Sequence, residues 1–152
     1  MTLLQRAARP MLAGMFIYGG LDAVRHPAGK APQAEPVVGG LADRLGERVE
    51  THHIVRFNGA VQVVAGAALA AGILARPASL ALAASLVPTT LAGHAFWKES
   101  DPAARAQQTI HFLKNVAMLG GLILAAADTG GRPSVPWRAK QAVGHAREHL
   151  PV

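Results

Sequence analysis

Seven polar side chains stand inside otherwise apolar stretches of the sequence, and their types could bind a small polar ligand. Imidazoles and amides both donate and accept hydrogen bonds, while a carboxylate and an ammonium group can balance each other or relay a proton. Two pairs are spaced four residues apart and share a helix face, namely Asn58 with Gln62 and His111 with Asn115. The candidate binding cluster consists of Asp22, Asn58, Gln62, His94, His111, Lys114 and Asn115.

The stretches that carry these residues are long and apolar enough to cross a bilayer. Hydrophobic residues make up 51% of the 152 residues and charged residues 16%, which is typical of a membrane protein. Residues 57–75 and 77–97 contain no Asp, Glu, Lys or Arg, and at about 1.5 Å per residue each covers a hydrocarbon core of about 30 Å. We therefore predict an all-α, membrane-embedded four-helix bundle over residues 1–128, with spans near 9–25, 56–75, 77–97 and 109–127.

Because four successive spans alternate in direction, the polar residues are predicted to lie at a similar depth in the bilayer. Both termini then lie on one side, and all seven candidates fall in the opposite half of the bilayer. Asp22 and Lys114 have opposite charges at similar depth, so we expect them to pair and to close a cluster built by all four helices. Three alternatives stay open: Lys114 reaching the headgroups, Asn58 and Gln62 serving only as interhelical hydrogen bonds, and His94 belonging to an interfacial aromatic belt.

Four segments between or after the spans complete the predicted organisation. Residues 37–53 place Leu41, Leu45 and Val49 four apart, which predicts an amphipathic helix on the bilayer surface between the first two spans. Residues 26–36, HPAGKAPQAEP, are expected to form a proline-rich connector, and Arg76-Pro77 a tight hairpin. Residues 129–152 form a basic polar tail.

Charge and residue counts exclude several kinds of site. The chain has no cysteine, which excludes disulfides, thiolate metal sites and cysteine nucleophiles, so electrons must come from a cofactor or a partner. The net charge of +6 comes from Lys and Arg that flank the apolar runs, which favours lipid headgroups over nucleic acid. The neighbours His52 and His53 project differently from a helix, so no metal site is expected. His94 and His111 are weak grounds for haem, which we do not expect.

The predicted membrane orientation depends on the basic residues of the C-terminal tail. With the N-terminus inside, seven cations lie on each side, so the positive-inside count does not decide. Tail cations near Trp137 suit anionic cytoplasmic lipid, so we expect a multi-pass cell-membrane protein with cytoplasmic termini. A cleaved secretory signal at Arg6 and Arg9 is the competing interpretation, although no small-x-small site follows at the usual distance.

Four sequences in the spans carry a resemblance to a known family. They are MLAGMFIYGGLDAV after Arg9 and Pro10, NGAVQVVAGAALAAGILARPASLAL, HAFWKESDP, and IHFLKNVAMLGGLILAAAD, of which we take the last as the most specific. From Arg9 to Asp128 the chain resembles the DoxX family of small four-helix bacterial membrane proteins, and its basic tail resembles actinobacterial members. Family members often carry a glutamate where this chain has Gln62, so a proton-transfer role at that position is not expected.

The resemblance implies a place in a membrane oxidoreductase complex. Related proteins are subunits of thiosulfate:quinone oxidoreductase, and others are linked to a superoxide dismutase and a thiosulfate sulfurtransferase in oxidative-stress defence. The cluster would then bind a quinone or a small sulfur oxyanion: Lys114 and His94 donate hydrogen bonds, Asn115 and Gln62 orient the ligand, and Asp22 balances Lys114 or relays a proton. No residue is assigned as catalytic, and the sequence does not decide whether the chain is an enzyme by itself.

Two other functions remain alternatives. A non-catalytic anchor would use the cluster only to hold its helices in register while its tail or surface helix recruits soluble redox enzymes. A small transporter would need polar residues through both halves of the bilayer, and the half nearer the termini is almost entirely Ala, Leu, Val, Ile and Gly, apart from Ser79 and Ser85.

Overall fold

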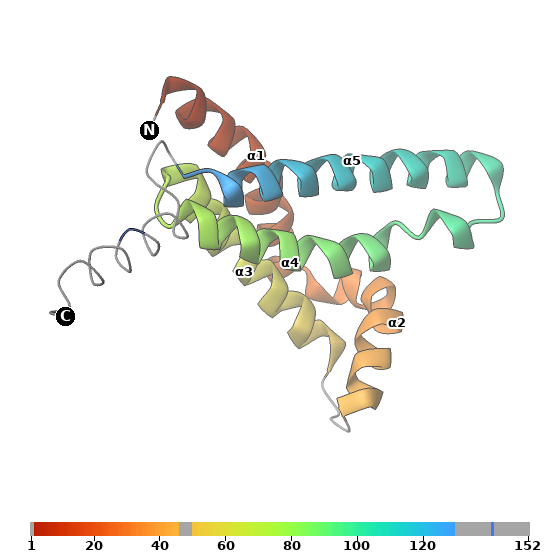
Figure 1. Cartoon of the computed structure of the whole chain (residues 1–152). Helices are drawn as coiled ribbons and strands as arrows, with labels where there is room; N and C mark the ends of the chain where they lie inside the picture. Colours follow the sequence, from red (N-terminus) through yellow and green to blue (C-terminus); the bar gives the residue numbers. More distant parts are fainter. Residues whose placement is uncertain (1, 46–49, 130–140, 142–152) are drawn as a thin grey trace, which may run out of the picture.

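The chain folds into α-helices connected by short turns (Figure 1). A computed structural model describes residues 2–45, 50–129 and 141, and no strand occurs among them. The predicted all-α class is thereby confirmed for these residues. Val49 of the predicted surface helix and most of the tail, apart from Thr129 and Gln141, are not among the described residues. The elements are α1 (Leu3–Arg25), α2 (Pro27–Leu45), α3 (Thr51–Ala71), α4 (Ala75–Gly93), the 3-10 turn η1 (Phe96–Lys98) and α5 (Pro102–Ala127).

Three of the described helices are long and apolar enough to cross a membrane. They extend over Thr51–Ala71, Ala75–Lys98 and Pro102–Ala127, which correspond to the second, third and fourth predicted spans. The first predicted span lies within α1, a 23-residue helix that is not among these three. A membrane protein with at least three candidate spans is therefore established by length and composition.

The helix core lies where α1, α3 and α4 meet. Helix α1 makes its most extensive contact with α3, where Gly20 and Gly59 allow the two backbones to approach closely. Leu69 and Leu82 are fully buried between these elements, and Leu122 of α5 joins them. The buried cluster comprises Ala13, Phe16, Ala65, Leu69, Ala78, Leu82, Leu86 and Leu122.

Helix α5 packs mainly along α4, so the predicted four-helix bundle arrangement is not confirmed. Beyond α4 it touches η1 and only a small part of α1, and the end of the α4–α5 hairpin projects away from the other helices (Figure 1). Of the residues in α5, only Asn115 and Leu122 are buried. Met118 and Leu119 are partly buried against the core. Five large apolar side chains of α5 are exposed, namely Ile110, Leu113, Val116, Ile123 and Leu124.

Polar contacts confirm the predicted alternation of helix direction. The Arg9 guanidinium, near the start of α1, lies 3.2 Å from the carboxylate of Asp128, just after α5. Gln5 donates to the same carboxylate at 2.8 Å, and Arg76 at the start of α4 donates to the carbonyl oxygen of Ala126 at 2.8 Å. The start of α1, the start of α4 and the end of α5 therefore lie at one end of the molecule.

The segment between the first two predicted spans differs from our expectation. Helix α2 begins at Pro27 and ends at Leu45, so the proline-rich connector is helical and the surface helix is shifted towards the N-terminus. Pro27 fits because the first helical residue needs no N–H donor. Pro32 and Pro36 lie four apart, so the hydrogen bonds they remove fall on one face. Thr51 of α3 donates to Glu35, which joins α2 to α3.

The tight hairpin between α3 and α4 is confirmed, but it lies before Arg76. Gly72 ends α3 with a φ of 72°, a left-handed conformation that glycine adopts without steric cost. Leu74 follows with a φ of 50°, and α4 starts at Ala75. Arg76 and Pro77 therefore occupy the first turn of α4, where the missing N–H of proline has no helical partner to lose.

Candidate functional site

The amides of α3 are bound by hydroxyl groups of α4. Gln62 donates through Nε2 to Oγ of Ser85 at 2.9 Å, and Ser85 donates to Oδ1 of Asn58 at 2.8 Å. Asn58 in turn donates to the hydroxyl of Thr89 at 3.2 Å. Gln62 and Ser85 are buried, so these bonds replace the water that the groups lose. The expected shared face of Asn58 and Gln62 is therefore confirmed.

The amide of α5 binds a different hydroxyl of the same helix. Asn115 donates through Nδ2 to Thr90 Oγ1 at 3.0 Å, while Thr90 donates to the carbonyl oxygen of Leu86 at 2.7 Å. Thr89 makes the same backbone bond to Ser85, at 2.7 Å. Our sequence analysis missed these hydroxyls and placed Ser85 in the apolar half. The available signal was the spacing of Ser85, Thr89 and Thr90 inside an apolar run, because such hydroxyls can link neighbouring helices.

His94 and His111 come together at the projecting end of α4 and α5. Their rings stack with centroids 5.2 Å apart and an interplanar angle of 26°. His94 ends α4, and its Nδ1 donates to the amide oxygen of Gln108 at 2.8 Å. All three side chains are half-buried. The sequence placed the two histidines at similar depth, and the structure adds Gln108 as the residue that orients one of them.

Aromatic side chains gather at the same end of α4 and α5 as this histidine pair. Phe112 of α5 makes edge contacts with Phe96 and Trp97 of η1, with ring centroids 5.3 Å and 5.9 Å apart. Phe96 and Trp97 also contact each other at 5.1 Å. Phe112 directly follows His111 and Phe96 lies two residues after His94, so both sets of side chains belong to the same end of α4 and α5. We call them together the histidine site: His94, Phe96, Trp97, Gln108, His111 and Phe112.

Asp22 does not pair with Lys114, so that prediction is wrong. Asp22 lies 2.6 Å from Nζ of Lys30 and 3.0 Å from Nδ1 of His26, at the corner between α1 and α2. Lys114 is exposed on α5, which contacts mainly α4 and only slightly α1. The physical reason is the one-sided packing of α5, since a lysine on that helix cannot reach a helix that it barely touches.

The seven candidates therefore separate into distinct groups. Asn58 and Gln62 join α3 to α4, Asn115 joins α5 to α4, and Asp22 belongs to the α1–α2 corner. The histidine site alone combines ring nitrogens with a partly open aromatic surface. Its stacked rings do not fit a haem held between two histidines, because axial ligands approach the iron from opposite faces and their rings are separated by the porphyrin.

Comparison with known proteins identifies the family. The DoxX family model matches residues 4–95, which include α1 to α4 and His94. The match stops before α5, so the sequence IHFLKNVAMLGGLILAAAD, which we took as the most specific, lies outside it. No curated protein and no solved structure significantly matches the chain. Because the matched residues cover more than half of its length, the chain belongs to the DoxX family.

Proposed function

We propose that this protein is a membrane subunit of an oxidoreductase complex and binds the headgroup of a quinone at the histidine site. Family membership and three apolar helices support its place in the bilayer. The observation that supports quinone binding is the stacked pair His94 and His111 beside an aromatic cluster. A quinone is a flat ring with oxygen atoms on opposite edges, so it suits aromatic faces combined with imidazole groups.

The hydrogen bond between Nδ1 of His94 and Gln108 leaves Nε2 as the ring nitrogen that can bind a ligand. An amide oxygen only accepts, so Nδ1 of His94 carries the proton in this bond. In the neutral ring Nε2 is then the acceptor, and it can take the proton of a quinol hydroxyl. The protonated ring can instead donate to a quinone carbonyl through Nε2. Gln108 therefore acts as a positioning residue for His94.

Electrons for this chemistry come from another subunit. The chain has no cysteine to relay them, and DoxX membership supports a role within a larger assembly. The exposed apolar surface of α5 offers area for such a subunit within the membrane. A sulfur oxyanion is the second class of ligand for the histidine site, and protonated imidazoles would bind it.

The second candidate function is a membrane anchor without a ligand site. The satisfied amides of Asn58, Gln62 and Asn115 favour this function, because each of them already holds two helices together. In this case the apolar face of α5 and the polar ends of the helices recruit redox partners. The two functions differ in whether the histidine site has a ligand.

Tryptophan fluorescence tests the proposed site directly. Trp97 lies in the histidine site, and replacing Trp137 by Phe leaves Trp97 as the sole tryptophan. Adding a short-chain quinone to this protein in detergent is expected to quench Trp97 with saturation, because bound quinones accept excitation energy or electrons. His111→Leu and Gln108→Leu should weaken the saturable part, whereas His26→Leu should not. Purely linear quenching in all proteins would favour the anchor, and saturation by thiosulfate alone would favour an oxyanion site.

A further inference from the structure

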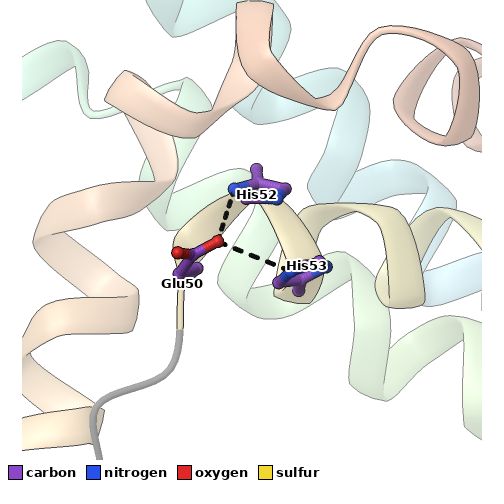
Figure 2. A group of neighbouring side chains, drawn as sticks. All are labelled: Glu50, His52 and His53. Carbon is purple, nitrogen blue, oxygen red and sulfur yellow. Dashed lines mark ion pairs between the residues drawn. The ribbon is translucent and has the colours of Figure 1, made fainter.

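A group of possible metal ligands lies at the start of α3, away from the histidine site in sequence. Glu50 precedes the first turn of α3, and His52 and His53 belong to that turn. Figure 2 shows both imidazoles directed towards the Glu50 carboxylate. Nδ1 of His52 lies 3.4 Å and Nε2 of His53 3.5 Å from the same oxygen, Oε2. These ligand atoms all lie within 4.8 Å of one another.

The spacing of these atoms suits a single metal ion. Zinc binds nitrogen and oxygen ligands at about 2.0–2.2 Å, which in a tetrahedral site places neighbouring ligand atoms roughly 3.3–3.6 Å apart. The two nitrogen–oxygen distances already fall in this range. Small side-chain rotations would bring the two nitrogens equally close, without a change in the helix. Binding would also neutralise the carboxylate where two imidazoles now contact it.

We propose that Glu50, His52 and His53 bind one divalent transition-metal ion of the zinc, cobalt and nickel class. Two imidazoles and one carboxylate are ligands that these ions prefer, and the site needs no thiolate. The Glu50, His52 and His53 side chains are 70%, 40% and 62% exposed, so water can complete the coordination. Three protein ligands leave at least one coordination position open, as in metal sites that exchange small ligands.

A pocket beside His52 could admit an anion that fills the open coordination position of the metal ion. His52 lines a cavity of about 880 Å³ between the start of α3 and the α1–α2 corner. Arg25, Arg56 and His26 also line it, together with Glu35, whose carboxylate accepts a hydrogen bond from Thr51. The two guanidinium groups outnumber this one carboxylate. Guanidinium groups favour anions, so a small oxyanion or a lipid phosphate could approach the metal from this side.

The structure corrects our reason for expecting no metal here. Neighbouring residues on a helix point in directions about 100° apart, which predicts that His52 and His53 diverge. In the first turn, however, both side chains lean back towards the N-terminus, where Glu50 lies. Their rings consequently lie 4.1 Å apart. Only the position of the helix start makes this convergence possible, and our predicted surface helix over 37–53 placed that start incorrectly.

Cobalt binding to the full chain in detergent tests the proposal. The protein must lack an affinity tag. His145→Ala with His149→Ala removes two tail histidines whose spacing of four could also bind a metal ion. In this background we expect one Co²⁺ per chain and visible absorption bands of a low-coordinate nitrogen and oxygen site. Zinc should displace the cobalt, because both ions prefer nitrogen and oxygen ligands of this kind.

Single substitutions identify the ligands. Glu50→Gln, His52→Ala and His53→Ala should each weaken Co²⁺ binding by more than the roughly tenfold loss that follows removal of an outer-shell partner. His26→Ala removes an exposed histidine that lines the neighbouring pocket but is not one of the three ligands, so it serves as the matched control, with unchanged Co²⁺ affinity expected when no anion is added. Circular dichroism and gel filtration should show that the variants remain folded, and Glu50→Gln preserves side-chain shape.

Two results would overturn the proposal. One is Co²⁺ affinity that stays the same in all three ligand variants. The other is the absence of stoichiometric binding to the folded background protein. Quinone quenching of Trp97 provides an independent readout, because Glu50→Gln is expected to leave it unchanged. Failure of the metal site is therefore distinguishable from failure of the proposed quinone function.

Discussion

Gly20 of α1 and Gly59 of α3 meet backbone to backbone. A Cβ atom on Gly20 would lie 2.7 Å from the carbonyl oxygen of Gly59, and one on Gly59 would lie 2.8 Å from the carbonyl oxygen of Gly20. Neither contact is possible without moving a helix, because both neighbours are backbone atoms. Helices in membranes rely on such close approach, since lipid provides no hydrophobic drive for association. This crossing therefore fixes α1 against α3.

Enlarging either glycine at this crossing should destabilise the protein. We expect Gly20→Ala or Gly59→Ala to lower the free energy of unfolding by about 1–3 kcal/mol, the usual cost of overpacking. Gly14→Ala is the matched control in α1, because a Cβ there meets nothing within 4 Å. Unfolding by SDS in mixed micelles gives the comparison. Equal stability of Gly14→Ala and Gly20→Ala would contradict the observed crossing.

The ion pair between Arg9 and Asp128 should hold the start of α1 to the end of α5. Arg9 is only 9% exposed, so Asp128→Asn leaves a largely buried cation with less compensation. We expect a loss of about 1–2 kcal/mol, below that of a fully buried pair because Asp128 is partly solvated. A double-mutant cycle with Arg9→Met measures the coupling. Additive effects of the two substitutions would show that the pair contributes nothing.

The hydrogen bond from Gln62 to Ser85 should contribute modestly to stability. Interhelical hydrogen bonds in membrane proteins average about 0.6 kcal/mol and reach about 1.7 kcal/mol. Because this pair is buried and also engages Asn58, we place its coupling in the upper half of that range. A cycle of Gln62→Leu and Ser85→Ala measures it. If these substitutions instead abolished quinone quenching while leaving stability intact, the amides would belong to a ligand site.

Asp22 should couple energetically to Lys30 and not to Lys114. Nζ of Lys30 lies 2.6 Å from the Asp22 carboxylate, whereas Lys114 is exposed on a helix that barely contacts α1. Two double-mutant cycles, each with Asp22→Asn, compare Lys30→Met with Lys114→Met. The Lys30 coupling should fall as salt rises, because both side chains are partly exposed. A larger coupling to Lys114 would restore the cluster that the sequence suggested.

The sequence predicts the helices well because their signals are local. Charge-free runs of sufficient length locate α3 and α4, and a long apolar run that carries Lys114 locates α5. Alternating direction correctly places the start of α1 beside Asp128. Residues four apart on a helix must share a face, so Asn58 and Gln62 were rightly grouped. These inferences require only helix geometry and the thickness of the bilayer.

The composition of the cluster could not be predicted because it depends on packing between helices. Sequence gives the depth of Lys114 but not the direction of its side chain, and α5 turned out to contact mainly α4. The partners of the amides, Ser85 and Thr90, resemble ordinary small residues in an apolar run. Likewise, the convergence of His52 and His53 depends on the start of α3 at Thr51. The prediction of a surface helix over 37–53 missed this start.

Quinone content of the purified protein is the most direct test of the central claim, which is that His94 and His111 form a quinone site. Protein extracted in mild detergent from native membranes should retain quinone in a fixed ratio to the chain. We predict that His94→Leu and His111→Leu lose this quinone, while the histidine control His26→Leu retains it. Equal quinone content in all four proteins, or none in the wild type, would contradict the claim.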